Sequence, residues 1–194
     1  YWKPDAFTLH VLPHWNWAGR EGTNVPVYVY TNGDEAELFL NGRSLGRRRK
    51  GEVQKADPTK KDFRGNRYYA IWDVPDEPGE LKVVAYRKGA KLGEKVVRTA
   101  GKSVRVQVTP EQTKLPADGK TVVFAAVDLV DAAGVRDPLA TDRIAVKVEG
   151  PGDLLSVSNG DARDLTSFVN FDSYPLYYGK AFVTLRRRAG QTGR

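Results

Sequence analysis

The chain has 194 residues, of which 40% are apolar, and its 31 lysine and arginine residues against 24 acidic residues give a net charge of +7. This composition excludes a disordered, collagen-like or low-complexity chain, because those classes need fewer apolar residues or far more than 19 glycines and 11 prolines. The longest apolar run, residues 122–130, is interrupted by Asp128 and is much shorter than the roughly 20 residues that cross a bilayer, so no membrane span is predicted.

The chain contains no cysteine and no methionine. Without cysteine it forms no disulfide bond, has no thiolate nucleophile, and cannot hold zinc or an iron–sulfur cluster through thiolates. Because neither an initiator methionine nor a signal region opens the chain at Tyr1, we interpret it as a fragment of a longer protein.

Alternation of apolar residues with period two is the strongest pattern in the first hundred residues, and it predicts strands. The Asn41-Gly42 pair is typical of a two-residue hairpin whose central residues need positive φ. The predicted strands cover residues 8–12, 25–30, 36–40, a return strand through Leu45, 68–74, 81–87 and 92–99. About seven short strands in about 100 residues predict an immunoglobulin-like β-sandwich.

A second set of strands follows residues 100–102, which we interpret as the joint between domains 1–101 and 102–194. Its strands are predicted at residues 104–108, 122–130, 144–148, 154–157 and 181–185. The predicted fold class is therefore all-β, with two immunoglobulin-like β-sandwich domains in tandem. Because the second set is short of a full sandwich, the expectation arises that this domain lacks its last strand.

The basic residues are concentrated between Arg43 and Arg67, where ten basic and three acidic residues give +7, the net charge of the whole chain. Such a patch could bind phosphate backbones, with bases stacked on Phe63, Tyr68 and Tyr69. The simpler interpretation, which we favour, is a solvated hairpin loop over residues 47–65 that keeps an exposed sheet edge from pairing with other chains. No nucleic-acid partner is predicted.

Few residues are candidates for catalysis. His10 and His14 are separated by Pro13 and lack the pattern of a zinc hydrolase, and no serine-hydrolase or phosphate-binding motif is present. Paired carboxylates can hydrolyse glycosides, but the acidic pairs here lie in turn-like segments that favour a structural role: Asp34 and Glu35, Asp76 and Glu77, and Asp161 and Asp164. We therefore predict no catalytic residue in this chain, no metal site and no cofactor.

Two tryptophans lie close together in the segment Trp15, Asn16 and Trp17. One interpretation is carbohydrate recognition, with an indole packed on a sugar ring and the amide bonded to hydroxyl groups. The other, which we favour, is a buried contact with a neighbouring domain, because aromatic side chains contribute large apolar areas to cores and interfaces. A second aromatic group admits the same two interpretations: Phe168, Phe171, Tyr174, Tyr177 and Tyr178.

The sequence also resembles a known family over nearly its whole length. Most specific are His-Val-Leu-Pro-His-Trp-Asn-Trp at residues 10–17, Glu-Leu-Phe-Leu-Asn-Gly-Arg-Ser-Leu-Gly at 37–46 and Pro-Gly-Glu-Leu-Lys-Val-Val-Ala-Tyr at 78–86. They closely resemble the region after the catalytic barrel in bacterial glycoside hydrolase family 2 enzymes of the β-galactosidase type. The second half, with residues 117–119, 148–152 and 159–161, resembles the additional immunoglobulin-like domain of the same enzymes.

The resemblance implies a non-catalytic fragment. In that family two glutamates on the barrel carry the reaction, and no residue here matches either motif. The implied partners are the barrel of the parent chain, which this region would support while shaping substrate access, and a galactoside or plant polysaccharide. The resemblance further implies an exported protein, and another strand after the position where this chain ends. An independent carbohydrate-binding module and a nucleic-acid-binding domain remain the alternatives.

Overall fold

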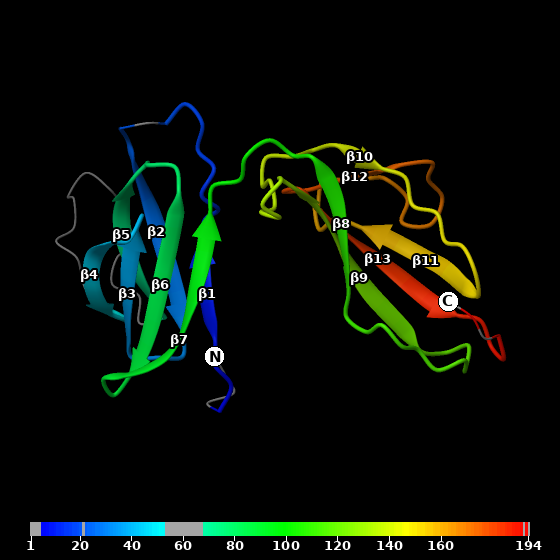
Figure 1. The fold of residues 1–194 in the computed structure, drawn as a ribbon, viewed down its shortest axis with the longest axis horizontal. Helices are drawn as coiled ribbons and strands as arrows, with labels where there is room; N and C mark the ends of the chain where they lie inside the picture. Colours follow the sequence, from blue (N-terminus) through cyan, green and yellow to red (C-terminus); the bar gives the residue numbers. More distant parts are fainter. Residues whose placement is uncertain (1–4, 21, 53–67, 192, 194) are drawn as a thin grey trace. The chain divides into compact units, whose positions relative to one another are not determined.

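The computed structural model describes residues 5–20, 22–52, 68–191 and 193, and all of their regular elements are β-strands (Figure 1). The all-β prediction is confirmed. Within these ranges no helix is long and apolar enough to cross a membrane. The chain divides into two units, Tyr1–Thr99 and Ala100–Arg194.

The first unit is a sandwich of two antiparallel sheets (Figure 1). One sheet has the order β1 (Leu9–Leu12), β2 (Asn24–Thr31) and β5 (Tyr69–Pro75). The other has the order β4 (Arg43–Arg49), β3 (Glu35–Leu40), β6 (Glu80–Arg87) and β7 (Ala90–Arg98).

Apolar side chains from both sheets meet in one core, because every second residue of a strand points to the same face. Val27 of β2, Leu38 of β3 and Leu81 of β6 are fully buried there. Between β3 and β4, Asn41 and Gly42 have φ values of 49° and 81°, which confirms the predicted hairpin turn.

The second unit has one large sheet and one small one. The large sheet has the order β11 (Gly152–Ser158), β13 (Lys180–Arg187), β9 (Val122–Val130) and β8 (Arg105–Pro110). The small sheet consists of β10 (Arg143–Ile144) and β12 (Tyr174–Pro175). Tyr174 and Ile144 of the small sheet pack against Val127 and Val183 of the large one, so the two sheets share a core.

One predicted strand is shorter than expected. The sequence pattern predicts a strand over residues 144–148, whereas the ladder of β10 ends at Ile144. The reason is that its partner β12 is only two residues long, so in the described part of the chain no strand runs beside residues 145–148.

Candidate functional site

The tryptophan segment forms a loop between β1 and β2 that Trp15 anchors to the first unit. The Trp15 side chain is 1% exposed and belongs to the core. Its indole Nε1 donates to the carbonyl oxygen of Glu77 at 2.8 Å, and its own carbonyl oxygen accepts from the Thr99 hydroxyl at 2.6 Å. The loop is therefore fixed to the turn between β5 and β6 and to the residue that follows β7.

Trp17 has different surroundings from Trp15, although the two are only two residues apart. It is half-buried and packs on the edge of the core. The His14 ring stacks on it, with 4.5 Å between ring centroids and 25° between planes, and the Arg20 guanidinium lies 5.3 Å from the ring centroid. The stack of His14, Trp17 and Arg20 is called the aromatic stack below.

The backbone holds the aromatic stack in place. The N–H of Asn16 donates to His14 Nδ1 at 3.3 Å, and the N–H of Arg20 donates to the carbonyl oxygen of Trp17 at 3.0 Å. The structure thus brings Trp15, Asn16 and Trp17 onto one loop, but only Trp17 presents its indole at the surface. Trp15 positions the loop.

Sequence reasoning missed two members of this cluster. His14 was considered only as a metal ligand, and Arg20 was not considered at all. The available signal was spacing, since His14 and Arg20 each lie three residues from Trp17. An imidazole, an indole and a guanidinium in contact offer an apolar face with a cationic rim, which suits a protein surface or a sugar ring.

The aromatic group of the second unit contributes mainly to packing. Tyr174 is fully buried, and Phe168 and Phe171 lie 6.5 Å and 5.4 Å from its ring centroid. Tyr177 and Tyr178 form an edge contact at 4.5 Å, with Tyr178 exposed. Burial raises the pKa of Tyr177, so its hydroxyl stays protonated at neutral pH.

The acidic pairs have structural partners. Asp161 accepts two bonds from the Arg163 guanidinium at 2.9 and 3.0 Å, and Asp164 accepts from Thr166 and Asn159. These hydrogen bonds hold the pKa of both carboxyl groups below the usual value. Both are therefore ionised at neutral pH, which disfavours a general-acid role for either.

Carboxylates of this kind make the second unit sensitive to acid. Asp118 accepts bonds from the hydroxyl and N–H of Thr121 and from the N–H of Lys120, which lower its pKa from 3.8 to about 2. Because the folded pKa lies below the unfolded one, its contribution to stability is complete above 3.8 and is lost as the pH falls through about 2.

We expect Asp118→Asn to flatten the pH dependence of unfolding in that acid range, which urea denaturation followed by circular dichroism would measure. Glu149→Gln is the matched control, because Glu149 lies in the same unit with an exposed side chain paired only to Lys147. Equal pH dependence in the Asp118 variant and the unsubstituted protein would contradict the assignment.

The basic stretch begins in a strand and not in a loop as predicted. Arg47, Arg48 and Arg49 belong to β4, opposite Glu37, Ala36 and Glu35 of β3. Arg47 lies 3.5 Å from Glu37, and Arg49 donates to Glu35 at 2.9 Å, so strand pairing neutralises these charges locally. Residues 53–67, including Phe63, lie outside the described residues.

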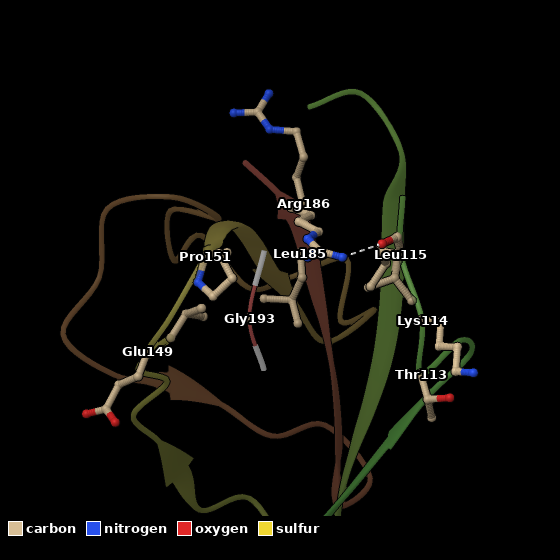
Figure 2. A pocket seen from close by; sticks show the side chains of 12 residues that line it. Thr113, Lys114, Leu115, Glu149, Pro151, Leu185, Arg186 and Gly193 are labelled. Carbon is tan, nitrogen blue, oxygen red and sulfur yellow. Dashed lines mark hydrogen bonds between the residues drawn. The ribbon is translucent and has the colours of Figure 1, made fainter. Parts of the chain in front are cut away.

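A pocket of about 550 Å³ lies in the second unit (Figure 2). Leu115, Pro151 and Leu185 line it, while the charged ends of Lys114, Glu149 and Arg186 point away from its centre. Figure 2 shows no convergence of polar groups, and among the described residues no three His, Cys, Asp or Glu side chains are grouped as metal ligands would be. The pocket is therefore not a site for acid–base or metal chemistry.

Comparison with known proteins identifies the family. Residues 106–193 match the model of glycoside hydrolase family 2 C-terminal domain 5, and residues 22–93 match a domain of unknown function, DUF4982. The chain is 34% identical over 183 residues to a β-galactosidase of Bacteroides ovatus, covering 94% of this chain and 20% of that protein. This chain is a C-terminal part of a family 2 glycoside hydrolase.

Two further similarities support the membership in family 2. A β-glucuronidase of Formosa agariphila is 28% identical over 154 residues, covering 77% of this chain and 14% of that protein. The crystal structure of a β-glycosidase from Bacteroides vulgatus superimposes with a TM-score of 0.81 and 28% identity, covering 97% of this chain and 22% of that chain. The family 2 region described here thus spans about a fifth of the length of these proteins.

Proposed function

We propose that this region is a non-catalytic support for the catalytic barrel of a family 2 glycoside hydrolase, and that the aromatic stack is its contact surface. The observation that carries the proposal is the anchoring of the loop by Trp15. A loop fixed by a buried indole and two hydrogen bonds has little conformational entropy left to lose when it meets another domain.

The chemistry of the aromatic stack suits a protein contact. Tryptophan and arginine dominate the energetics of protein interfaces, where a ring fills a shallow apolar pocket and polar groups form the rim. Trp17 supplies the ring, and Arg20 and His14 supply the rim. A surface of this kind would hold the barrel in place and would form part of the wall around its substrate entrance.

Trp17→Ala in the full-length enzyme is expected to shorten the half-life of activity at elevated temperature by about fivefold, which corresponds to a loss of roughly 1 kcal/mol. Phe124→Ala is the matched control, because Phe124 is 44% exposed on the outer face of β9 in the second unit. A raised KM in the Trp17 variant would indicate the additional role in substrate access. Equal half-lives of the two variants would disprove the supporting role.

We further propose that the parent enzyme is a β-galactosidase. The support is the higher identity and wider coverage of the similarity to the Bacteroides ovatus protein than of that to the Formosa agariphila protein. The same assays therefore use an aryl β-galactoside and an aryl β-glucuronide side by side, and a larger kcat/KM for the glucuronide would overturn this choice. The isolated chain is expected to hydrolyse neither.

A second candidate function is carbohydrate binding by the aromatic stack, which the surface position of Trp17 favours. In that case a galactoside or plant polysaccharide would change tryptophan fluorescence at millimolar concentration, and Trp17→Ala would abolish the change. A Trp17 variant that keeps the response, or no response to any glycan, would leave the protein contact as the function of the loop. Nucleic-acid binding is not proposed, since the described arginines of β4 pair with carboxylates.

A further inference from the structure

The inner face of the large sheet in the second unit is covered only in part. Val106 and Val108 of β8 lie opposite Leu129 and Val127 of β9, so they share the face on which Val127 is buried. Val127 is 4% exposed, whereas Val106 and Val108 are 50% and 59% exposed. The side chains that cover β9 therefore do not extend over β8.

A cleft of about 510 Å³ lies over these two valines. Its floor is formed by inward side chains of the large sheet, and its other wall by the segment that follows β10, with Ile144, Val146 and Val148. The pocket of Figure 2 continues this cleft, because Val148 and Leu185 line both. The two together form one apolar groove between the sheet and residues 144–148.

The wall of the groove has the pattern of a strand that lacks a neighbour. Ala145 and Lys147 are exposed while Val146 and Val148 are half-buried, which is the period-two alternation of a β-strand. The pairing of β10 with β12 ends at Ile144, and the described chain places no strand beside residues 145–148. Extended backbone with unpaired N–H and C=O groups is a template for the addition of a strand.

We propose that a β-strand contributed by the same polypeptide, from outside residues 1–194, occupies this groove. It pairs with residues 145–148 and places apolar side chains at alternate positions on Val106 and Val108. Together with β10 it completes the second layer of the sandwich. The occupant is thus an extended segment with alternating apolar residues, which has the period of the surface that it covers.

The source of the strand follows from two considerations. This chain spans 20% of the length of the Bacteroides ovatus β-galactosidase and 22% of the Bacteroides vulgatus chain, so proteins of this kind have much polypeptide outside the corresponding region. A segment of the same chain also loses less translational and rotational freedom on docking than a separate molecule does.

Photo-crosslinking in the full-length protein tests the proposal. p-Benzoylphenylalanine replaces Val108 in one variant and Val122 in a control, because Val122 is 39% exposed on the opposite face of the same sheet. The expected product at position 108 is an intramolecular crosslink to a segment outside residues 1–194 with alternating apolar residues. A crosslink between two copies, or a yield at position 108 no higher than at position 122, would overturn the proposal.

Hydrogen exchange in the same full-length protein gives a second readout. The amides of residues 145–148 are expected to exchange at least about tenfold more slowly than those of an unpaired surface segment, because strand pairing protects them. Val108→Asp should remove this protection, and Val122→Asp should preserve it. Fast exchange, protection that depends on protein concentration, or protection that appears only with added oligosaccharide would each contradict the proposal.

Discussion

Trp15→Ala is expected to destabilise the first unit by about 3–5 kcal/mol, the usual cost of removing a large aromatic side chain from a core. Trp15 is 1% exposed and is among the largest fully buried side chains of the described residues. The substitution would leave a cavity between the sheets and an unpaired carbonyl oxygen at Glu77, which loses its indole donor.

Urea denaturation followed by near-ultraviolet circular dichroism would measure this effect. Trp17→Ala is the matched control, because it removes the same side chain from the same loop at a half-buried position. We expect it to cost less than about 2 kcal/mol, since much of the Trp17 ring remains accessible to solvent in the folded state. Equal losses in the two variants would show that Trp15 does not anchor the loop.

Gly179→Ala is expected to destabilise the second unit by about 2–5 kcal/mol. Gly179 has a φ of 66°, and a Cβ atom at this position would collide with the carbonyl oxygen of Asp137. The left-handed conformation costs a non-glycine residue about 1–2 kcal/mol, and overpacking adds about 1–3 kcal/mol. The backbone cannot move away easily, because the N–H of Gly179 donates to Ala140 and its carbonyl oxygen accepts from Leu129, both at 2.9 Å.

Gly190→Ala provides the control for this prediction. Gly190 has nearly the same φ, 68°, but no atom lies within 4 Å of the position that its Cβ would take. Its substitution should therefore cost only the conformational part, about 1–2 kcal/mol. If thermal unfolding gave the same shift for both variants, the close approach of Asp137 would have no energetic weight.

Local patterns in the sequence predicted most strands, since period-two alternation depends only on neighbouring residues. Val25, Val27 and Val29 point inward as the alternation indicates, and the Asn41-Gly42 turn follows from the conformations these two residues tolerate. The end of β10 at Ile144 was not predictable, because a strand needs a partner that may be absent. Similarly, the arginines after Gly46 extend β4 because carboxylates of β3 lie opposite them.

The candidate site was predicted in location but not in detail. Trp15 and Trp17 are equivalent in a period-two pattern, and their difference depends on residues distant in sequence. Glu77 and Thr99 lie 62 and 84 positions from Trp15 and bind its polar groups. No local signal reveals these contacts, so sequence reasoning could not separate the anchoring indole from the surface one.

The hydrogen bonds of Thr99 have a mechanical consequence. Its hydroxyl donates to Trp15 and accepts from the N–H of Gly79, while its own N–H donates to the carbonyl oxygen of Gly79, all within 3.0 Å. Tension applied to the polypeptide at residue 100 would load these three bonds before the rungs of β7. Stretching would therefore release the tryptophan loop first, and the sandwich would lose its docking surface before it lost its sheets.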